Sequence, residues 1–472
     1  MAIFYNEGNK MIRPGVYQRH TTNSTEILVG SIDGICAIPV QASWGPLGKV
    51  VKNLNSADLK TNYGSGEYGT GYTVPAAAAM FDGGATTVYT YRLGTGGKAA
   101  SLTLSDTLTV TAKHVGTMSI SVAVQTKLGT TATKQLLVYV GSTLVETWDF
   151  AADTKTEGAN LISATAESKY VTVTGEAAAV AILAVASGAL TGGENPTVTN
   201  SDYSAAFAAL EQYYYNTIAI DVDDDETMTL SLLLQEYLDN AYMMGKLGIA
   251  VVGEKTTVDF DTRLEHAAAF DDAKVVYLGG GWKSESTSKD GALAICYTAG
   301  VIASTPSNRG ITHAVINGAT DLCETLTFSQ HEDAIRYGML TVSMSPDGAI
   351  WYDSGINTLI NPEEGVQDEG WKKIRRVKVR FELIDRLDRA LMPKVGRVSA
   401  DSDGIADIIQ TGQRVLDAMA NSEGKLFPGA TFIEDPANPF EGDSGYFIIQ
   451  SDDIDSLEKI YLQYQFRYSQ KS

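Results

Sequence analysis

Cysteine is scarce in this chain of 472 residues, which has only Cys36, Cys296 and Cys323. Their wide spacing excludes a disulfide framework and a CxxC metal knuckle, and it is typical of a reducing compartment. Long apolar runs are lacking too, since the longest, Ala177–Leu190, has 14 residues and is too short to cross a bilayer. The first residues lack the basic and apolar regions of a signal peptide. We therefore expect a protein made in the cytoplasm, without stable membrane insertion.

Positive charge is also in short supply. The chain has 36 lysine and arginine residues against 57 aspartate and glutamate residues, a formal net charge of -21. Such a surface repels a phosphate backbone, so we expect no direct contact with nucleic acid. Hydrophobic residues make up 44% of the chain, a globular composition, and the length suggests about three domains.

Four sequence patterns follow one another and predict an α+β multidomain fold. Residues 1–20 show no periodicity and contain Pro14 and Gly15, which predicts an extended N-terminal arm. Residues 96–195 hold 17 threonines and no proline, with repeated strand-like runs, which predicts an inserted all-β domain. On either side, residues 21–95 and 196–345 alternate between strand-like and helical segments, which predicts one discontinuous α/β-layered core. In this core, a helix is expected over 73–81 and another after an N-cap at Ser201.

Residues 346–472 are predicted to form an α+β C-terminal domain that ends in an extended strand or arm. A single apolar stripe on one helix is formed by Ile374, Val377, Phe381, Ile384, Leu387 and Leu391. A second helix is expected over 405–419. Near the terminus, one set of apolar residues alternates with Tyr461, Gln463, Gln465 and Arg467, and this period of two predicts a strand. The alternating residues are Ile460, Leu462, Tyr464, Phe466 and Tyr468.

A basic stretch on the first of these helices reverses the charge of the chain locally. It consists of Lys372, Lys373, Arg375, Arg376, Lys378 and Arg380. Two interpretations are open: a solvated helix face, or a surface complementary to an acidic partner.

Three motifs resemble catalytic or ligand-binding sites, and each has a defect. Gly442–Gly445 copies the nucleophile loop of trypsin-like proteases, but Tyr446 follows it and no histidine has the matching context. Gly248–Gly253 is similar to a phosphate-binding loop, but Glu254 precedes the lysine and would repel phosphate. Asp221–Glu226 is similar to a calcium loop without its central glycine. We expect no enzyme, no cofactor and no metal site.

Several short segments, in order along the chain, resemble the contractile tail sheath family of phages and phage-tail-like particles. The family's opening signature is resembled by the N-terminal run Arg13, Pro14, Gly15, Val16 and Tyr17. Residues 112–117 resemble the start of the family's inserted β-domain, and residues 190–193 with 202–218 its return into the core. Residues 299–303 and 308–319 resemble the segment before the C-terminal domain. The chain resembles in particular the sheath proteins of phage-like elements of Gram-positive bacteria.

This resemblance implies a structural subunit without catalysis. Sheath subunits form stacked hexameric rings around an inner tail tube, between baseplate and tail terminator proteins. On triggering, the sheath contracts and drives the tube through a target envelope with energy stored at assembly. The resemblance also implies that the protein is made in the host bacterial cytoplasm and is then located in a virion tail or in a phage-tail-like bacteriocin particle.

The residues themselves suggest how subunits hold one another. An extended N-terminal arm of about 17 residues reaches about 55 Å, and the alternating strand at Ile460–Tyr468 offers an edge. We expect arms of neighbouring subunits to add to a sheet of the C-terminal domain. The basic stretch is expected to face the tube. Two other classes stay open: a surface-layer or adhesin-type self-assembling protein, and a P-loop NTPase, which the defect at Glu254 disfavours.

Overall fold

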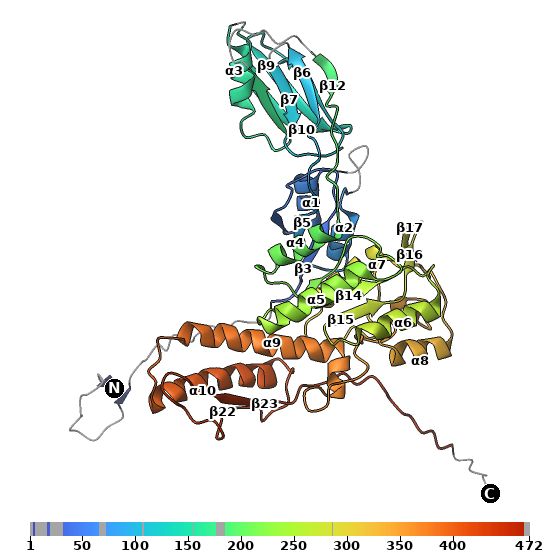
Figure 1. Ribbon diagram of the computed structural model, residues 1–472, viewed down its shortest axis with the longest axis vertical. Coiled ribbons are helices and arrows are strands. Elements are labelled where there is room, and N and C mark those ends of the chain that lie inside the picture. Colours follow the sequence, from blue (N-terminus) through green and yellow to red (C-terminus); the bar gives the residue numbers. More distant parts are fainter. Residues whose placement is uncertain are drawn as a thin grey trace.

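The computed structural model describes residues 3–4, 17–18, 32–65, 72–105, 108–153, 155–175, 185–285 and 287–466. Its parts follow one another along the long axis of the molecule (Figure 1). A β-rich domain lies at one end, a sheet covered by helices lies in the middle, and a helical domain lies at the other end. The described part of the C-terminal segment leads away from the body near the helical domain. The mixed architecture confirms the predicted α+β fold class.

The middle part is built on a seven-stranded sheet with the order β19-β15-β14-β13-β3-β5-β4. All neighbouring strands are parallel except β4 and β5. Parallel strands covered on both faces are apolar throughout, and here Ile249–Gly253 is completely buried. The bounds are β3 Ile35–Val40, β4 Val50–Asn53, β5 Thr87–Arg92, β13 Thr217–Ile218, β14 Ile249–Gly253, β15 Val275–Leu278 and β19 Met339–Leu340.

Helices cover both faces of this sheet, and the alternation of side chains along each strand separates two cores. Cys36 and Ile38 pack with α2 and α7 on one face. Ala37, between them, packs with α4, α5 and α6 on the other. The bounds are α2 Pro75–Asp82, α4 Asn200–Leu210, α5 Thr229–Met243, α6 Phe260–Phe270 and α7 Ala292–Ser304.

Both predicted helix starts are shifted by two residues. Helix α2 begins at Pro75 and not at residue 73, and Pro75 lies in its first turn, as expected. In α4, the N-cap is Thr199 and not Ser201, because Thr199 and Asp202 form a reciprocal capping box.

The β-rich end domain contains two sheets, with the orders β10-β9-β8-β12 and β11-β7-β6. Its own core includes Leu108, Val122, Leu136 and Val171. One helix, α3 Glu157–Ala164, packs on β10, which the prediction of an all-β domain did not include. The bounds are β6 Ser101–Ser105, β7 Leu108–Ala112, β8 Ile120–Thr126, β9 Thr133–Val140, β10 Thr143–Ala151, β11 Val171–Gly175 and β12 Val185–Ala189.

A narrow neck joins this domain to the sheet. Its two chain segments pair antiparallel at Thr95–Thr197, Lys98–Glu194 and Ser101–Thr191. At its base lies the fully buried Arg92, whose guanidinium donates to the carbonyl oxygens of Ala42, Gly45 and Val115 at 2.8–3.1 Å. Hydrogen bonds in five fixed directions make arginine suited to such a joint.

The helical domain is formed by α9 Ile374–Leu391, α10 Ser402–Asp417 and a hairpin of β22 Thr431–Glu434 and β23 Phe447–Gln450. A helix forms where the apolar spacing from Ile374 to Leu391 predicted one, but the single apolar stripe is wrong. Val377 and Phe381 pack on the sheet, whereas Val379 and Leu383, outside the stripe, pack on α10. Ile384 is 43% exposed. The helix lies between two cores and is buried on two faces.

Short elements complete the described chain. The remaining bounds are β1 Ile3–Phe4, β2 Tyr17–Gln18, α1 Ser56–Tyr63, β16 Trp282–Ser284, β17 Thr287–Lys289, β18 Asp321–Leu322, α8 Phe328–Arg336, β20 Val342–Met344, β21 Ile350–Tyr352 and η2 Glu369–Lys372. Strands β1 and β2 pair with each other in parallel. None of the described helices is long and apolar enough to span a membrane.

Candidate functional site

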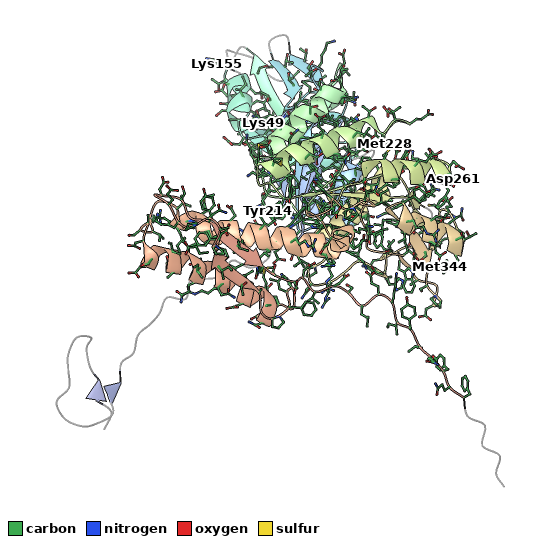
Figure 2. The ribbon with its side chains drawn as sticks, turned by 60° about the horizontal axis from the view of Figure 1, so that its bottom comes forward. Lys49, Lys155, Tyr214, Met228, Asp261 and Met344 are labelled. Atoms are coloured by element: carbon green, nitrogen blue, oxygen red, sulfur yellow. The ribbon has the colours of Figure 1, made fainter. Side chains whose placement is uncertain are left out.

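The C-terminal segment leaves the body as an exposed arm. From Ile454 to Phe466 the backbone forms no strand, so the predicted strand is wrong for the described part, and Tyr468 lies outside it. Apolar side chains nevertheless dominate the arm: Ile460 and Leu462 are each 70% exposed, and Phe466 is 93% exposed. Figure 2 shows this segment, with its side chains, standing clear of the rest of the chain. A row of exposed apolar residues on an extended backbone is a surface in need of a partner.

The root of the arm is fastened to the first turns of α9. The carboxylate of Asp453 accepts hydrogen bonds from Arg376 at 2.5 and 2.8 Å and from Arg380 at 3.1 Å. Further along, Ser456 accepts a hydrogen bond from Arg375 at 2.9 Å, and Glu458 forms an ion pair with Lys373. Paired, partly buried charges of this kind fix a geometry better than exposed ones.

The backbone adds to this root. The amide of Phe427 donates to the carbonyl of Asp452 at 2.8 Å, and the amide of Ile454 donates to that of Lys425 at 2.9 Å. On the other side, the hydroxyl of Thr312 donates to Glu458 at 2.9 Å, which ties the arm to the sheet domain as well. The arm is therefore attached to the body of the molecule as far as Glu458, and it is exposed beyond that residue.

Electrostatics favour the ionised form of Asp453. Burial raises the pKa of this carboxyl, but the hydrogen bonds and charges of Arg376 and Arg380 outweigh burial and hold it below its ordinary value. Asp368 pairs with the same two arginines, and its pKa is lowered, first by its hydrogen bond from Arg380. The two carboxylates share the positive charge of one helix face.

The predicted basic surface is thus paired within the chain. Lys372 pairs with Glu369. The cations that bind the root of the arm are Lys373, Arg375, Arg376 and Arg380. Lys378 is buried, and its ammonium donates to the carbonyl oxygens of Ile302, at 2.6 Å, and Thr305. Burial lowers the pKa of Lys378 to about 8. The structure thus pairs the basic stretch within the chain, and its expected contact with a tube stays a prediction.

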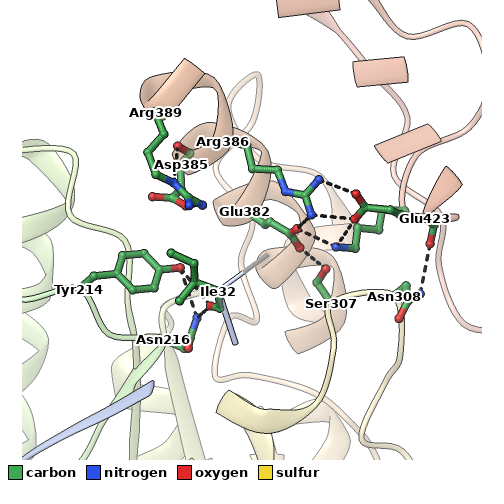
Figure 3. Close-up of polar contacts among 11 residues, drawn as sticks. Ile32, Tyr214, Asn216, Ser307, Asn308, Glu382, Asp385, Arg386, Arg389 and Glu423 are labelled. Carbon is green, nitrogen blue, oxygen red and sulfur yellow. Dashed lines mark hydrogen bonds and ion pairs between the residues drawn. The ribbon is translucent and has the colours of Figure 1, made fainter. Parts of the chain in front are cut away.

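Buried ions also join α9 to the rest of the chain (Figure 3). Glu382 binds Lys425 at 2.6 Å and Arg386 at 2.5 Å, and it accepts a hydrogen bond from Ser307. Arg386 continues to Glu423 through two hydrogen bonds of 2.6 and 2.7 Å. Because each charge has a partner, the cost of burial is offset, and loss of one partner would leave the others uncompensated.

A groove of about 610 Å³ lies between α9 and β23. The buried side chains of Val379, Leu383 and Leu426 line it, together with Trp371, which lies 4.6 Å under the guanidinium of Arg380. Two exposed apolar side chains also line it, Val366 (67% exposed) and Ile449 (42% exposed), together with charged side chains that include Asp368, Arg376 and Asp453. Beside the groove, the two-stranded sheet β22–β23 has no third strand among the described residues. Open strand edges pair readily with another chain.

Comparison with known proteins now identifies the architecture. Residues 197–358 match the family described as the phage tail sheath protein central domain. The sheath tail protein of Desulfitobacterium hafniense is 22% identical, with a TM-score of 0.69, over 93% of this chain and 100% of that one. The sheath tail protein of Listeria innocua is 18% identical, with a TM-score of 0.68, over 91% and 97%.

The contracted helical sheath of the anti-feeding prophage has the same overall fold, with 12% identity and a TM-score of 0.55 over 97% of this chain and 99% of that one. This chain has the tail sheath fold. The resemblance seen in its sequence, to sheath proteins including those of Gram-positive bacteria, is confirmed.

The N-terminal signature of the sheath fold is only partly described. Arg13, Pro14, Gly15 and Val16 lie outside the described residues, and Tyr17 begins β2. Their role between subunits stays a prediction, as does that of the C-terminal residues from Ile460 to Tyr468.

The three motif-like segments have structural roles in this chain. Glu254 is buried, lies 2.7 Å from a ring nitrogen of His266 and accepts a hydrogen bond from the hydroxyl of Tyr277. In the acidic loop, Asp224 accepts from the amides of Leu230 and Ser231 at the start of α5. The described residues contain no group of three or more metal-ligating side chains.

The turn that resembled a protease loop carries an exposed Ser444, whose hydroxyl donates to the neighbouring Asp443. No histidine is among its hydrogen-bond partners in the described chain. The groove and the arm root escaped the sequence analysis. A signal for the root was present, since Asp453, Asp455 and Glu458 are acidic residues shortly before the apolar row.

Proposed function

We propose that this chain is the structural subunit of a contractile tail sheath. Subunits polymerise as stacked hexameric rings around an inner tail tube, from a baseplate to a tail terminator. Contraction drives the tube through a target envelope with free energy stored at assembly, without a catalytic step. The particle is a virion tail or a phage-tail-like particle, assembled after synthesis in the bacterial cytoplasm.

The single observation that carries this proposal is the exposed apolar arm on a fixed root. Residues 460–466 are too apolar to remain in water in a functional protein, yet Asp453 and Glu458 hold their origin in place. A fixed origin with an unoccupied extended segment is the form of a strand donor. The tail sheath fold and its likeness to an assembled helical sheath support the same conclusion.

Arms of neighbouring subunits link the polymer in this proposal. They add to the β22–β23 sheet of the C-terminal domain, so main-chain hydrogen bonds persist while the domains rotate as rigid bodies. The C-terminal domain faces the tube, and the β-rich domain faces outward, in line with their positions at opposite ends of the molecule (Figure 1). Like charges, at -21 per subunit, repel one another around each ring, and their separation contributes to contraction.

Negative-stain microscopy tests the proposal. The full chain is expected to form striated hollow tubes, whereas flat lattices would support a surface-layer protein and dispersed monomers would contradict self-assembly. A variant without residues 1–17 should stay folded and monomeric. Sheath-like tubes from that variant would refute the role of the N-terminal arm.

A further inference from the structure

The two ends of the seven-stranded sheet differ in charge. Strand β4 forms one end of the sheet, and β19 forms the other. Helix α1 packs against β4, whereas α6 and α8 pack against β19. In Figure 2, Lys49, next to β4, lies near the β-rich domain, and Asp261 of α6 lies on the far side of the sheet domain. The two ends therefore cannot meet within one molecule.

The β4 end is basic, and its positive charge is unpaired. Four lysines on β4, on α1 or close to them form no ion pair with any described residue: Lys49, Lys52, Lys60 and Lys113. Burial first, and then neighbouring positive charge that includes Lys113 and Lys49, lower the pKa of His114 to about 4, so both lysines lie close to this ring. The basic stretch of α9, in contrast, is paired throughout.

Neither the local carboxylate nor the local apolar surface is used up by these lysines. Asp58, at the start of α1, accepts a hydrogen bond from the amide of Leu54 at 2.8 Å. The side chain of Leu54, directly after β4, is 58% exposed. The β4 end thus combines free positive charge with an exposed leucine.

The α6–α8 end is acidic. Three exposed carboxylates on these two helices have no cationic partner in the described part of the chain: Asp261, Glu265 and Glu332. The cations of the same helices are already engaged, since Arg263 is buried against Glu324 and Arg336 binds Asp333 at 2.8 Å. The net charge of this end is therefore negative at its surface.

Apolar side chains accompany the carboxylates at this end. Phe328 is 80% exposed and Ile335 is 46% exposed, and their spacing of seven residues places them on one side of α8. An exposed apolar patch rimmed by charge is the usual form of an interaction surface.

We propose that the basic β4 end of one copy binds the acidic α6–α8 end of the next copy around a ring. This inference rests on the proposed sheath function and specifies a contact that involves neither terminal arm. Because the two surfaces lie at opposite ends of one sheet, the contact is head-to-tail and repeats from copy to copy. Lysines of one copy lie opposite carboxylates of the next, and Leu54 faces the side of α8 that carries Phe328 and Ile335.

The charge of the chain supports this partner. Residues 196–345 carry 21 acidic residues against 8 lysine and arginine residues, so the sheet domains of neighbouring copies repel one another unless their charged ends are ordered. Contact between unlike ends offsets part of that repulsion, whereas contact between like ends increases it. Opposite charge on two surfaces raises the rate of encounter and fixes their orientation more than it raises affinity. All copies in a ring therefore point the same way around it.

Cross-linking of the assembled full-length protein tests the placement. Tubes are formed from equal amounts of unlabelled protein and protein labelled with heavy nitrogen, and a carbodiimide then joins lysines directly to carboxylates in contact. Mass spectrometry should find Lys49 or Lys52 linked to Asp261, Glu265 or Glu332, with one light and one heavy peptide, which only two copies can supply. Lys155, at the outer part of the β-rich domain (Figure 2), should form no such link.

Charge reversal tests the same contact without chemical modification. Lys49→Glu with Lys52→Glu should slow assembly at low salt about tenfold in light scattering, as should Glu265→Lys with Glu332→Lys, whose sites lie inside helices and away from their caps. The four changes together should restore the rate to within about threefold of wild type. Lys155→Glu with Lys246→Glu, two exposed lysines elsewhere, has the same net charge as the first variant and should assemble like wild type. Salt at about 0.5 M should remove most of the differences.

The outcomes separate this inference from the proposed function. If wild-type protein forms no polymer, the proposed function fails. If tubes form without mixed cross-links between the two ends, the contact fails and the sheath function stands. A fourfold variant that assembles no faster than either pair also overturns the contact. Equal rates for the Lys49 and Lys52 pair and for its control would do the same, and would leave these lysines only the role of keeping an edge strand from pairing.

Discussion

Removal of the Asp453 carboxylate should release the root of the C-terminal arm without unfolding the domain. Asp453→Ala deletes three charge-assisted hydrogen bonds, from Arg376 and Arg380, at 2.5–3.1 Å. The side chain of Asp453 is 8% exposed and that of Arg376 is 21% exposed, so solvent screens the pair only in part. Hydrogen bonds to charged groups contribute about 1.5–3 kcal/mol, and the arginines keep Asp368 as a partner. We therefore expect a loss of about 2 kcal/mol, localised at the root.

Hydrogen exchange measures this local opening. The amides of Phe427 and Ile454 bond across the root, so their protection reports on it. A loss of about 2 kcal/mol corresponds to roughly 30-fold faster exchange at these two amides. Amides in β14, in the middle of the large sheet, should not change. Asp388→Ala, an exposed carboxylate on the same helix, is the matched control.

Acid should reproduce the effect in the wild type. The pKa of Asp453 is lower in the folded chain than in the unfolded chain, so the carboxylate stabilises the root above its unfolded pKa of about 3.9. This contribution is lost as the pH falls through the lower folded pKa. Exchange of the two reporter amides, corrected for intrinsic rates, should therefore begin to converge between wild type and Asp453→Ala below about pH 4 and become equal only below the folded pKa. Identical protection in both proteins at pH 7 would refute the reasoning.

Three further substitutions test other joints of the molecule. Arg92→Lys should destabilise the neck by about 2–4 kcal/mol, because lysine cannot reproduce hydrogen bonds to three separate carbonyls; small-angle scattering of the monomer should report a more variable shape, and an unchanged profile and melting temperature would contradict this. Glu382→Gln should cost about 3–5 kcal/mol in urea unfolding, because Lys425 and Arg386 lose a buried counter-charge; a cost below 1 kcal/mol would argue that water already solvates the cluster. Lys378 has a folded pKa of about 8, below its ordinary value of 10.5, so the unfolded chain binds more protons between these two pH values. The free energy of unfolding of the wild type should therefore rise with pH across this window, by roughly 3 kcal/mol relative to Lys378→Met. Parallel pH profiles of the two proteins would refute the assignment.

Periodicity in the sequence predicted elements well wherever their partners lie within the same chain. The alternation of strands and helices around Ile249–Gly253 is confirmed, because a doubly covered parallel strand is apolar along its whole length. The helix predicted from the apolar spacing between Ile374 and Leu391 is confirmed for a similar reason, since the two cores on either side both belong to this chain.

The failed predictions concern partners that periodicity does not specify. Alternation at Ile460–Phe466 describes a strand, but a strand needs a ladder partner, and a single chain offers none there. The sequence leaves two interpretations of the charges from Lys372 to Arg380 open, because their partners at Asp453 and Glu458 lie about eighty positions further along the chain. Composition counts charges but does not pair them, so the sequence contains the acidic residues of the root without indicating which cations bind them.

The neck of the β-rich domain makes that domain replaceable. Its two chain segments enter and leave side by side, with Thr95 opposite Thr197 on antiparallel backbones. A two-residue turn of the kind found in hairpins would close this gap if the intervening residues were removed. The seven-stranded sheet contains no strand from the removed region. Evolution, or an engineer, can therefore exchange this domain for another with closely spaced termini while the sheet and the arms keep their geometry.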